Sequence, residues 1–118
     1  MTVITGDTKN KVENTIKEIV SKMLLGGFTN RSHQVIASIT SLSLFDIPLD
    51  EENSDRDTLI YGPIIIHARV YVHLRGGDGQ ASDSIDLRIN SVKFKFDYDT
   101  KDYEIENPDK VALIDMTN

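Results

Sequence analysis

The chain has 118 residues, a mass of 13.3 kDa, 13 Lys and Arg against 19 Asp and Glu, and no cysteine. A chain of this length suits one domain, so we expect residues 1–118 to fold as a single unit. The lack of cysteine excludes disulfides, thiolate metal sites and cysteine nucleophiles. A net charge of −6 argues against general nucleic-acid binding, because neutralising phosphates requires a basic surface.

Targeting and membrane-spanning segments are not predicted. The first residues lack the basic and apolar regions of a secretory signal. The longest apolar runs, such as residues 64–66, are far shorter than the roughly 20 residues that span a bilayer. We therefore expect a soluble cytoplasmic protein that makes no membrane contact.

Residues 8–25 are predicted to form an amphipathic helix. Apolar side chains recur there at the spacing that places them on one helix face: Val12, Ile16, Ile19, Val20, Met23 and Leu24. Asp7 or Thr8 can cap the first turn, and Gly26-Gly27 suits the left-handed conformation that ends many helices. The stripe predicts that the helix packs against the rest of the chain.

Residues 33–46 fit two kinds of secondary structure. A helical spacing joins Val35, Ile36, Ile39 and Leu42, whereas one face of a strand joins Ile36, Leu42 and Leu44. The many β-branched and hydroxyl side chains are weak helix formers and favour the strand. The acidic stretch 46–57 contains Pro48 and is expected to be an exposed loop.

Residues 59–75 are predicted to form the clearest strand. From Ile64 to Leu74 the even positions are apolar, and the odd positions from His67 to Arg75 carry polar or aromatic side chains. This alternation predicts one buried face and one face that is wet or functional. Gly62-Pro63 is expected to start the strand or to bulge its edge.

A hairpin is expected to follow, with its turn at Gly77-Asp78 or at Asp78-Gly79. The first turn places Arg69 opposite Asp86. The second places Arg69 opposite Arg88, which is less favourable because like charges then face each other. We favour the first turn, and a longer irregular loop is the third alternative.

The next strand is predicted to change face at Asn90-Ser91. Its apolar residues occupy odd positions up to Ile89 and even positions from Val92, so we expect a β-bulge between them. A turn at residues 99–102 and a last short strand at residues 111–114 complete the pattern.

One helix followed by antiparallel strands predicts the α+β class. We expect an N-terminal amphipathic helix packed on a curled antiparallel sheet of about four strands. This layout resembles that of cystatin-like proteins in architecture only, because no sequence motif of a known family is present. Architecture alone does not determine function.

Charge is segregated along the chain. Segments 46–57 and 97–118 each carry a net charge of −5, whereas segments 1–45 and 60–96 each carry +2. The basic residues of 60–96 lie mostly at positions predicted to face away from the core. The wet side of the sheet is therefore expected to be mildly basic and bordered by acidic loops.

The candidate binding residues are His67, Arg69, Tyr71, His73 and Arg88. Their guanidinium and imidazole groups can bind an anion or a partner, and an imidazole can also transfer protons near neutral pH. The alternative is a solvated face or a subunit interface, since alternation by itself produces such a face. No catalytic residue is predicted, because no Gly-x-Ser-x-Gly elbow is present.

Metal and cofactor sites are not predicted. His67 and His73 lie about 20 Å apart along a strand and cannot share an ion. The acidic turn at residues 97–104 lacks the spacing of an EF-hand loop. We therefore expect neither a metal nor a cofactor.

The leading hypothesis is a non-catalytic interaction protein. It would form a homodimer through the open face or a free edge of the sheet, or bind another protein. The alternative is a small-ligand domain or enzyme with a cavity between sheet and helix, whose polar contacts would be Tyr98, Tyr103, His67 and Arg69. Local nucleic-acid contact through the Arg/Lys face is the third and least favoured hypothesis.

Overall fold

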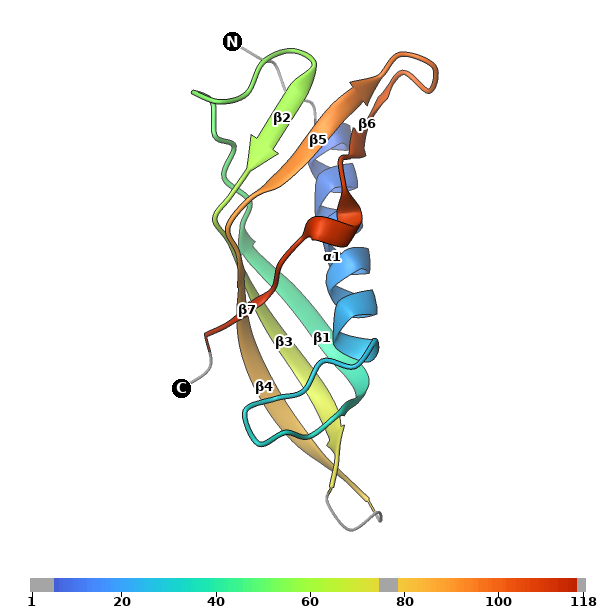
Figure 1. The fold of residues 1–118 in the computed structure, drawn as a ribbon, viewed down its shortest axis with the longest axis vertical. Coiled ribbons are helices and arrows are strands. Elements are labelled where there is room, and N and C mark those ends of the chain that lie inside the picture. The colour runs from blue at the N-terminus through green and yellow to red at the C-terminus, as the bar shows by residue number, and fades with distance from the viewer. Residues whose placement is uncertain (1–5, 75–78, 117–118) are drawn as a thin grey trace.

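The computed structural model describes residues 6–74 and 79–116. Its elements, labelled in Figure 1, are α1 (Gly6–Leu25), β1 (Ile36–Asp46), β2 (Thr58–Tyr61), β3 (Ile64–His73), β4 (Gln80–Ile89), β5 (Val92–Asp97), β6 (Asp102–Ile105), the 3₁₀ helix η1 (Pro108–Lys110) and β7 (Ile114–Asp115). The α+β class is confirmed. The described strands form two antiparallel sheets instead of one sheet of about four strands, in the orders β1-β3-β4-β7 and β2-β5-β6.

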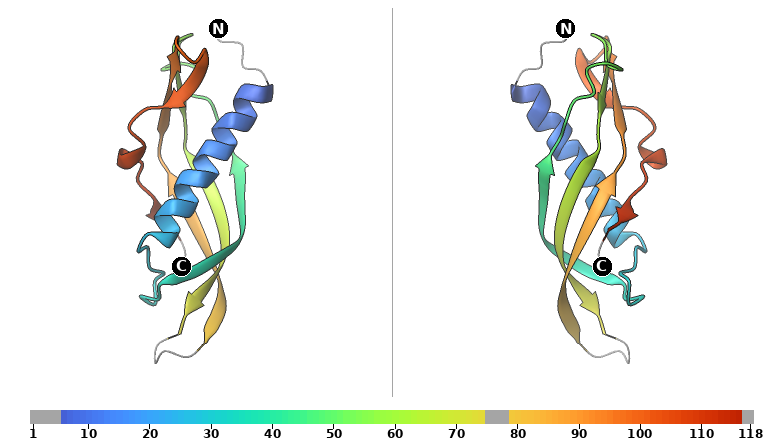
Figure 2. Two further views of the ribbon diagram at one scale, coloured as in Figure 1. Left: turned by 90° about the vertical axis from the view of Figure 1, so that its right-hand side faces the viewer. Right: turned by 90° about the vertical axis from the view of Figure 1, so that its left-hand side faces the viewer.

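Helix α1 packs diagonally across one face of the four-stranded sheet, as both views in Figure 2 show. The predicted stripe is confirmed, and four of its residues are at most 1% exposed: Val12, Ile16, Val20 and Leu24. Their four-residue spacing keeps them on one side of the helix. The helix begins at Gly6, so Asp7 and Thr8 lie within its first turn instead of preceding it.

Strand β1 explains why the sequence of residues 33–46 was ambiguous. The segment is a strand, as its composition favoured, but its pairing with β3 shifts register between Ile36 and Ser38, between Ile39 and Ser41, and between Leu44 and Asp46. An extra residue at a bulge separates inward side chains by three positions instead of two. The apolar spacing therefore imitates a helix although the backbone is extended.

The expectation that Gly62-Pro63 starts the long strand is confirmed, since β3 begins at Ile64 directly after it. The residues before it, which the prediction joined to the same strand, form β2 in the other sheet. Tyr61 pairs with Val92 and Ile64 pairs with Ile89, so two residues on each chain segment separate the two ladders. The buried positions are odd in β2 and even in β3, just as they change between β4 and β5. The buried side chains therefore change face at Asn90-Ser91 and also at Gly62-Pro63, which lies opposite on the neighbouring segment. Both segments have two unpaired residues there, so the predicted β-bulge, which adds a residue to one strand only, is wrong.

The register of the β3–β4 hairpin differs from both predicted turns. His67 pairs with Asp86, and Arg69 pairs with Ser84 instead of Asp86 or Arg88. The core faces still match, because the true register is shifted by two or four residues and an even shift preserves the face. Gly77 and Asp78 of the two predicted turns lie outside the described residues.

Asn30 fastens the loop after α1 to strand β4. It is 8% exposed, and its side-chain amide donates to Asp83 Oδ2 and to Gln34 Oε1, each at 2.9 Å. Its own Oδ1 accepts a hydrogen bond from the backbone N–H of Gln34 at 2.9 Å. The Asp83 carboxylate faces the end of the core, and the hydrogen bond from Asn30 satisfies it. The sequence pattern did not reveal this role of Asn30.

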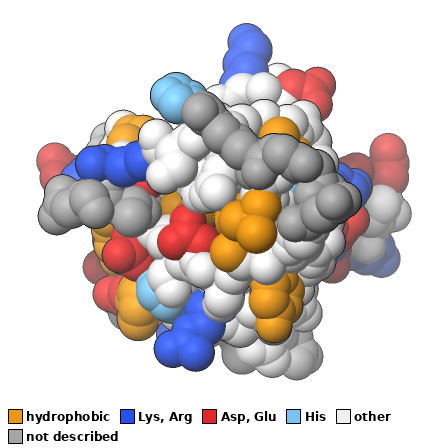
Figure 3. All heavy atoms as spheres, turned by 90° about the horizontal axis from the view of Figure 1, so that it is seen from below, with side chains coloured by type: hydrophobic (Ala, Val, Ile, Leu, Met, Phe, Trp, Pro, Cys, Tyr) orange, Lys and Arg blue, Asp and Glu red, His pale blue; other side chains and the backbone are white. Residues whose placement is uncertain are grey.

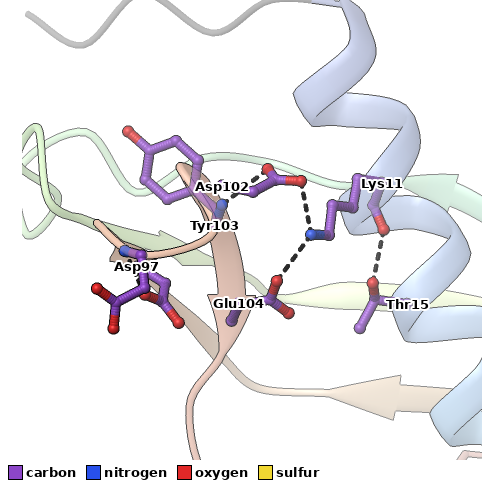
Figure 4. Close-up of polar contacts among 7 residues, drawn as sticks. Lys11, Thr15, Asp97, Asp102, Tyr103 and Glu104 are labelled. Carbon is purple, nitrogen blue, oxygen red and sulfur yellow. Dashed lines mark hydrogen bonds and ion pairs between the residues drawn. The ribbon is translucent and has the colours of Figure 1, made fainter.

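Lys11 joins the helix to the three-stranded sheet. Its Nζ donates to Asp102 Oδ2 at 2.7 Å and to Glu104 Oε1 at 3.1 Å, as Figure 4 shows. The hydrogen bond from Lys11 lowers the pKa of Asp102, and the same bond raises the pKa of Lys11. Because β6 lies far from α1 in sequence, this contact holds the helix against the three-stranded sheet and does not stabilise the helix by itself.

Replacing Lys11 with glutamine is expected to lower the free energy of unfolding by about 0.5–1 kcal/mol near neutral pH, since the ion pair is half exposed. The pKa of Asp102 is lowered in the folded chain, so this contribution is present above the unfolded carboxyl pKa and disappears as the pH falls through the folded value. Urea unfolding at about pH 7 and about pH 3 measures both effects.

The matched control is Lys17→Gln, which removes a pair to Glu13 at 3.4 Å within the helix. It is expected to cost about 0.3–0.5 kcal/mol. Equal losses for the two variants would show that Lys11 does not link α1 to β6.

Candidate functional site

The outer face of the four-stranded sheet is the side turned away from α1. No element of the described chain covers it, and the right-hand view of Figure 2 looks onto it. Strand β3 runs through its middle with β1 and β4 on either side. The buried and exposed side chains of β3 alternate, which confirms one core face and one outer face.

Four of the five predicted residues follow one another at alternate positions of β3, and Arg88 projects from the same face of β4. Arg69, His73 and Arg88 are exposed, Tyr71 is 42% exposed, and His67 is partly buried. The sheet therefore places all five on the outer face. Arg88 pairs with Ile65, so it lies about 13 Å along the sheet from Arg69, and the five do not converge on one point.

Serines flank the side chains of Arg69 and Tyr71 on this face. Arg69 lies between Ser41 of β1 and Ser84 of β4, and Tyr71 lies between Ser38 and Ser82. Short side chains at paired positions leave a guanidinium and a phenol ring projecting from the sheet. This arrangement offers hydrogen-bond donors to a partner surface without a surrounding wall.

His67 is held in a fixed orientation. Its Nδ1–H donates to Asp86 Oδ1 at 2.7 Å, and its ring lies 6.3 Å from that of Phe45. The side chain of Ser43 occupies the paired position on β1, so a serine, a histidine and an aspartate form one row across three strands. In that row a hydrogen bond joins His67 to Asp86, and this bond orients the imidazole.

An apolar patch lies beside this row. Phe45 is 67% exposed and lies on the β1 side of Ile65, which is partly buried. Ile114 of β7 is 40% exposed, and Arg88 of β4 separates it from Ile65. Ile65 and Ile114 both pair with Arg88, which aligns them across the sheet. The sequence pattern did not indicate Phe45 and Ile114 as outer-face residues, because only the register brings them to this face.

The predicted basic face is divided between the two sheets. Lys93 and Lys95 are exposed as expected, but they belong to β5 in the other sheet, and Lys93 pairs with Glu106 at 3.6 Å. Arg75 lies outside the described residues. Arg69 and Arg88 are therefore the main cations of the outer face in the described part of the chain.

The two acidic segments meet at one end of the molecule. The loop between β1 and β2 and the β5–β6 hairpin lie together at the top of Figure 1. Tyr98 donates a hydrogen bond to Asp57, which raises the pKa of Tyr98, and the Tyr103 hydroxyl donates to the carbonyl oxygen of Arg56 at 2.8 Å. We call residues 50–57 and 97–102 the acidic end.

The opposite end has a different surface. Figure 3 shows hydrophobic, basic and acidic side chains mixed there, without one dominant charge. Exposed apolar residues occur at or next to the ends of elements: Leu25 is the last residue of α1, Val35 precedes β1 and Leu74 follows β3. Charge therefore varies along the long axis of the molecule and not only between its faces.

Two surface hollows accompany these features. One of about 400 Å³ lies between α1 and η1 and is lined by Ile19, Lys22, Met23, Pro108, Asp109 and Val111. Another of about 570 Å³ lies at the β5–β6 hairpin and includes Tyr98. His67 and Arg69 line neither hollow, so the structure does not gather the four polar contacts expected for a small ligand.

Within residues 6–74 and 79–116, no three His, Asp or Glu side chains are grouped so that they could hold a metal ion. In the same residues no helix is both long and apolar enough to cross a bilayer.

The features that point to function are thus an uncovered sheet face, an oriented histidine, two exposed arginines and an adjoining apolar patch. Comparison of the chain with protein-family models, with curated proteins and with solved structures found no match.

Proposed function

We propose that this chain is a non-catalytic interaction protein that acts in the cytoplasm and self-associates through its outer face. The observation that carries the proposal is the exposure of Phe45 and Tyr71, at 67% and 42%, on a sheet face that no described element covers. Aromatic side chains and arginine are the residues that contribute most to protein–protein contacts. A second copy would bury both rings without any change of fold.

The face suits association better than the edge of the sheet does. In the described chain β1 pairs only with β3, so its other side is an edge. Its three register shifts twist that edge, and such irregularities hinder strand addition. The Thr40 hydroxyl also donates to the carbonyl oxygen of Arg69 at 3.0 Å, which holds one shift in place.

Sedimentation equilibrium over a range of protein concentrations tests the proposal. The unmodified chain is expected to dimerise, and Tyr71→Ser and Phe45→Ser are each expected to raise the dissociation constant about ten-fold or more. Leu25→Ser is the matched control, because Leu25 is 52% exposed but lies at the end of α1, away from the outer face. A monomer at every concentration would contradict self-association.

Small-ligand binding between helix and sheet is the second candidate. The hollow between α1 and η1 favours it, since its volume of about 400 Å³ falls in the range of ligand pockets. Fragment screening by NMR should then shift the signals of Met23 and Val111 before those of the outer face. The layout of one helix across a sheet also resembles cystatin-like proteins, a likeness that concerns architecture and assigns no activity.

A further inference from the structure

We infer that the two copies of the proposed dimer lie antiparallel, with the acidic end of each copy against Arg69 of the other. This inference rests on the proposed self-association and names its geometry. It commits the outer face to one occupant, a second copy of this chain. Three observations lead to it: the charge distribution along the molecule, the position of the apolar patch and the area of the face.

Charge is distributed unevenly along an elongated shape. The molecule measures 53 × 28 × 23 Å, and the acidic end lies at one extremity of its long axis. Within that end, Glu51 and Glu52 are exposed on the loop before β2. Arg69 is exposed on the four-stranded sheet and takes part in no ion pair within the described chain. Each copy therefore presents the charge that complements the other copy.

Arg69 and Asp57, the residue at which the acidic end joins β2, are about equally far from the Gly62-Pro63 break in the long β2–β3 segment. Arg69 follows the Gly62-Pro63 break by six residues, and Asp57 precedes it by six. At about 3.3 Å per residue, each lies about 20 Å from the break. A two-fold axis in the contact plane, perpendicular to the strands and close to the break, would place each acidic end opposite the other copy's Arg69.

The apolar patch lies where this axis would pass. Ile65 is two residues beyond the break, and the exposed ring of Phe45 lies on its β1 side. On its other side Arg88 of β4 separates Ile65 from the exposed Ile114 of β7, so the apolar contact at the axis is that of Phe45 and Ile65. A two-fold axis brings a surface against its own copy, so an apolar patch at the axis meets an identical apolar patch. In a parallel arrangement the patches would also meet, but the two acidic ends would then repel each other.

The outer face by itself is too small for a stable dimer, so the contact between the two copies has to extend beyond it. Three strands spaced about 4.8 Å apart and about 33 Å long cover roughly 480 Å² of projected surface. A stable interface needs about 800 Å² from each partner. The remaining area has to come from neighbouring surface, and the antiparallel arrangement supplies it from the acidic end of the second copy.

Charge reversal tests this geometry by sedimentation equilibrium at low salt. Arg69→Glu alone, and the double variant Glu51→Lys with Glu52→Lys, should each raise the dissociation constant at least about ten-fold, because each puts like charges in contact. Mixing the two variants should restore a dimer within about three-fold of the unmodified affinity, since both contacts then join opposite charges. Lys110→Glu, on η1 at the helix side, is the control and should change nothing.

The salt dependence of the dimer is compared between the unmodified chain and Arg69→Glu, because salt also screens the repulsion between two copies that each carry a net charge of −6. Raising the salt should narrow the difference in dissociation constant between the two, since it weakens the opposite-charge contact of one and the like-charge contact of the other. Charge reversals that leave the dissociation constant unchanged at low salt would overturn the antiparallel geometry and leave self-association standing. A chain that remains monomeric would remove both proposals, so the two failures are distinguishable.

Discussion

Replacing Phe94 with alanine should lower the free energy of unfolding by about 3–5 kcal/mol, the largest loss that we expect from one substitution. Its side chain is fully buried, and its ring meets the ring of Tyr61 edge to face at 5.9 Å. Truncation removes a large apolar side chain from the core and leaves a cavity that its neighbours can only partly fill. Urea unfolding followed by circular dichroism measures the loss.

Phe45→Ala is the matched control, because the same atoms are deleted where the ring is 67% exposed. At protein concentrations low enough to keep the chain monomeric, it should cost less than about 0.5 kcal/mol. At concentrations that favour the proposed dimer, the loss should grow, since association stabilises the folded state. Equal losses for both phenylalanines at low concentration would mean that Phe94 is not a core residue.

Replacing Gly62 with alanine should destabilise the fold by about 3 kcal/mol, from backbone strain and steric overlap together. The residue has a φ of +148°. A Cβ there would lie 2.9 Å from the carbonyl carbon of Asn90 and from Cα of Ser91, and nearer still to the Asn90 oxygen. The two chain segments would have to separate where β2 passes into β3 and β4 passes into β5.

Gly27→Ala separates the two causes of that loss. Gly27 also has a positive φ, +112°, but a Cβ there would have no atom within 4 Å. It should therefore cost only the conformational part, about 1 kcal/mol. Thermal unfolding of both variants makes the comparison, and a Gly62 variant no less stable than the Gly27 variant would rule out a close approach of the backbones.

The structure explains why one long strand was predicted where two exist. Residues 59–75 contain a change of burial from odd to even positions at Gly62-Pro63, and the apolar residues Ile60 and Tyr61 conceal that change in the sequence. The same change was recognised at Asn90-Ser91, because polar residues separate Ile89 from Val92. Gly62-Pro63 lies opposite Asn90-Ser91 because of pairing between residues far apart in sequence, and no local sequence pattern predicts that pairing.

The outer face was predicted in part. Alternation along β3 identified His67, Arg69, Tyr71 and His73 as residues of one face, since the two-residue period of a strand is a local property. The partners of those residues depend on register. Asp86 therefore appeared as a partner of Arg69 in the sequence analysis, whereas it binds His67 in the structure.

The amino-acid sequence by itself determined the helix, the extended character of most later segments and the alternation along β3, because each follows from side-chain periodicity over a few residues. Only the tertiary structure decided that the strands form two sheets, that Phe45 and Ile114 reach the outer face beside Ile65 and Arg88, and that residues 50–57 meet residues 97–102 at one end. These features depend on contacts between residues far apart in sequence. Such contacts are selected by the packing of the whole core, which local propensity does not specify.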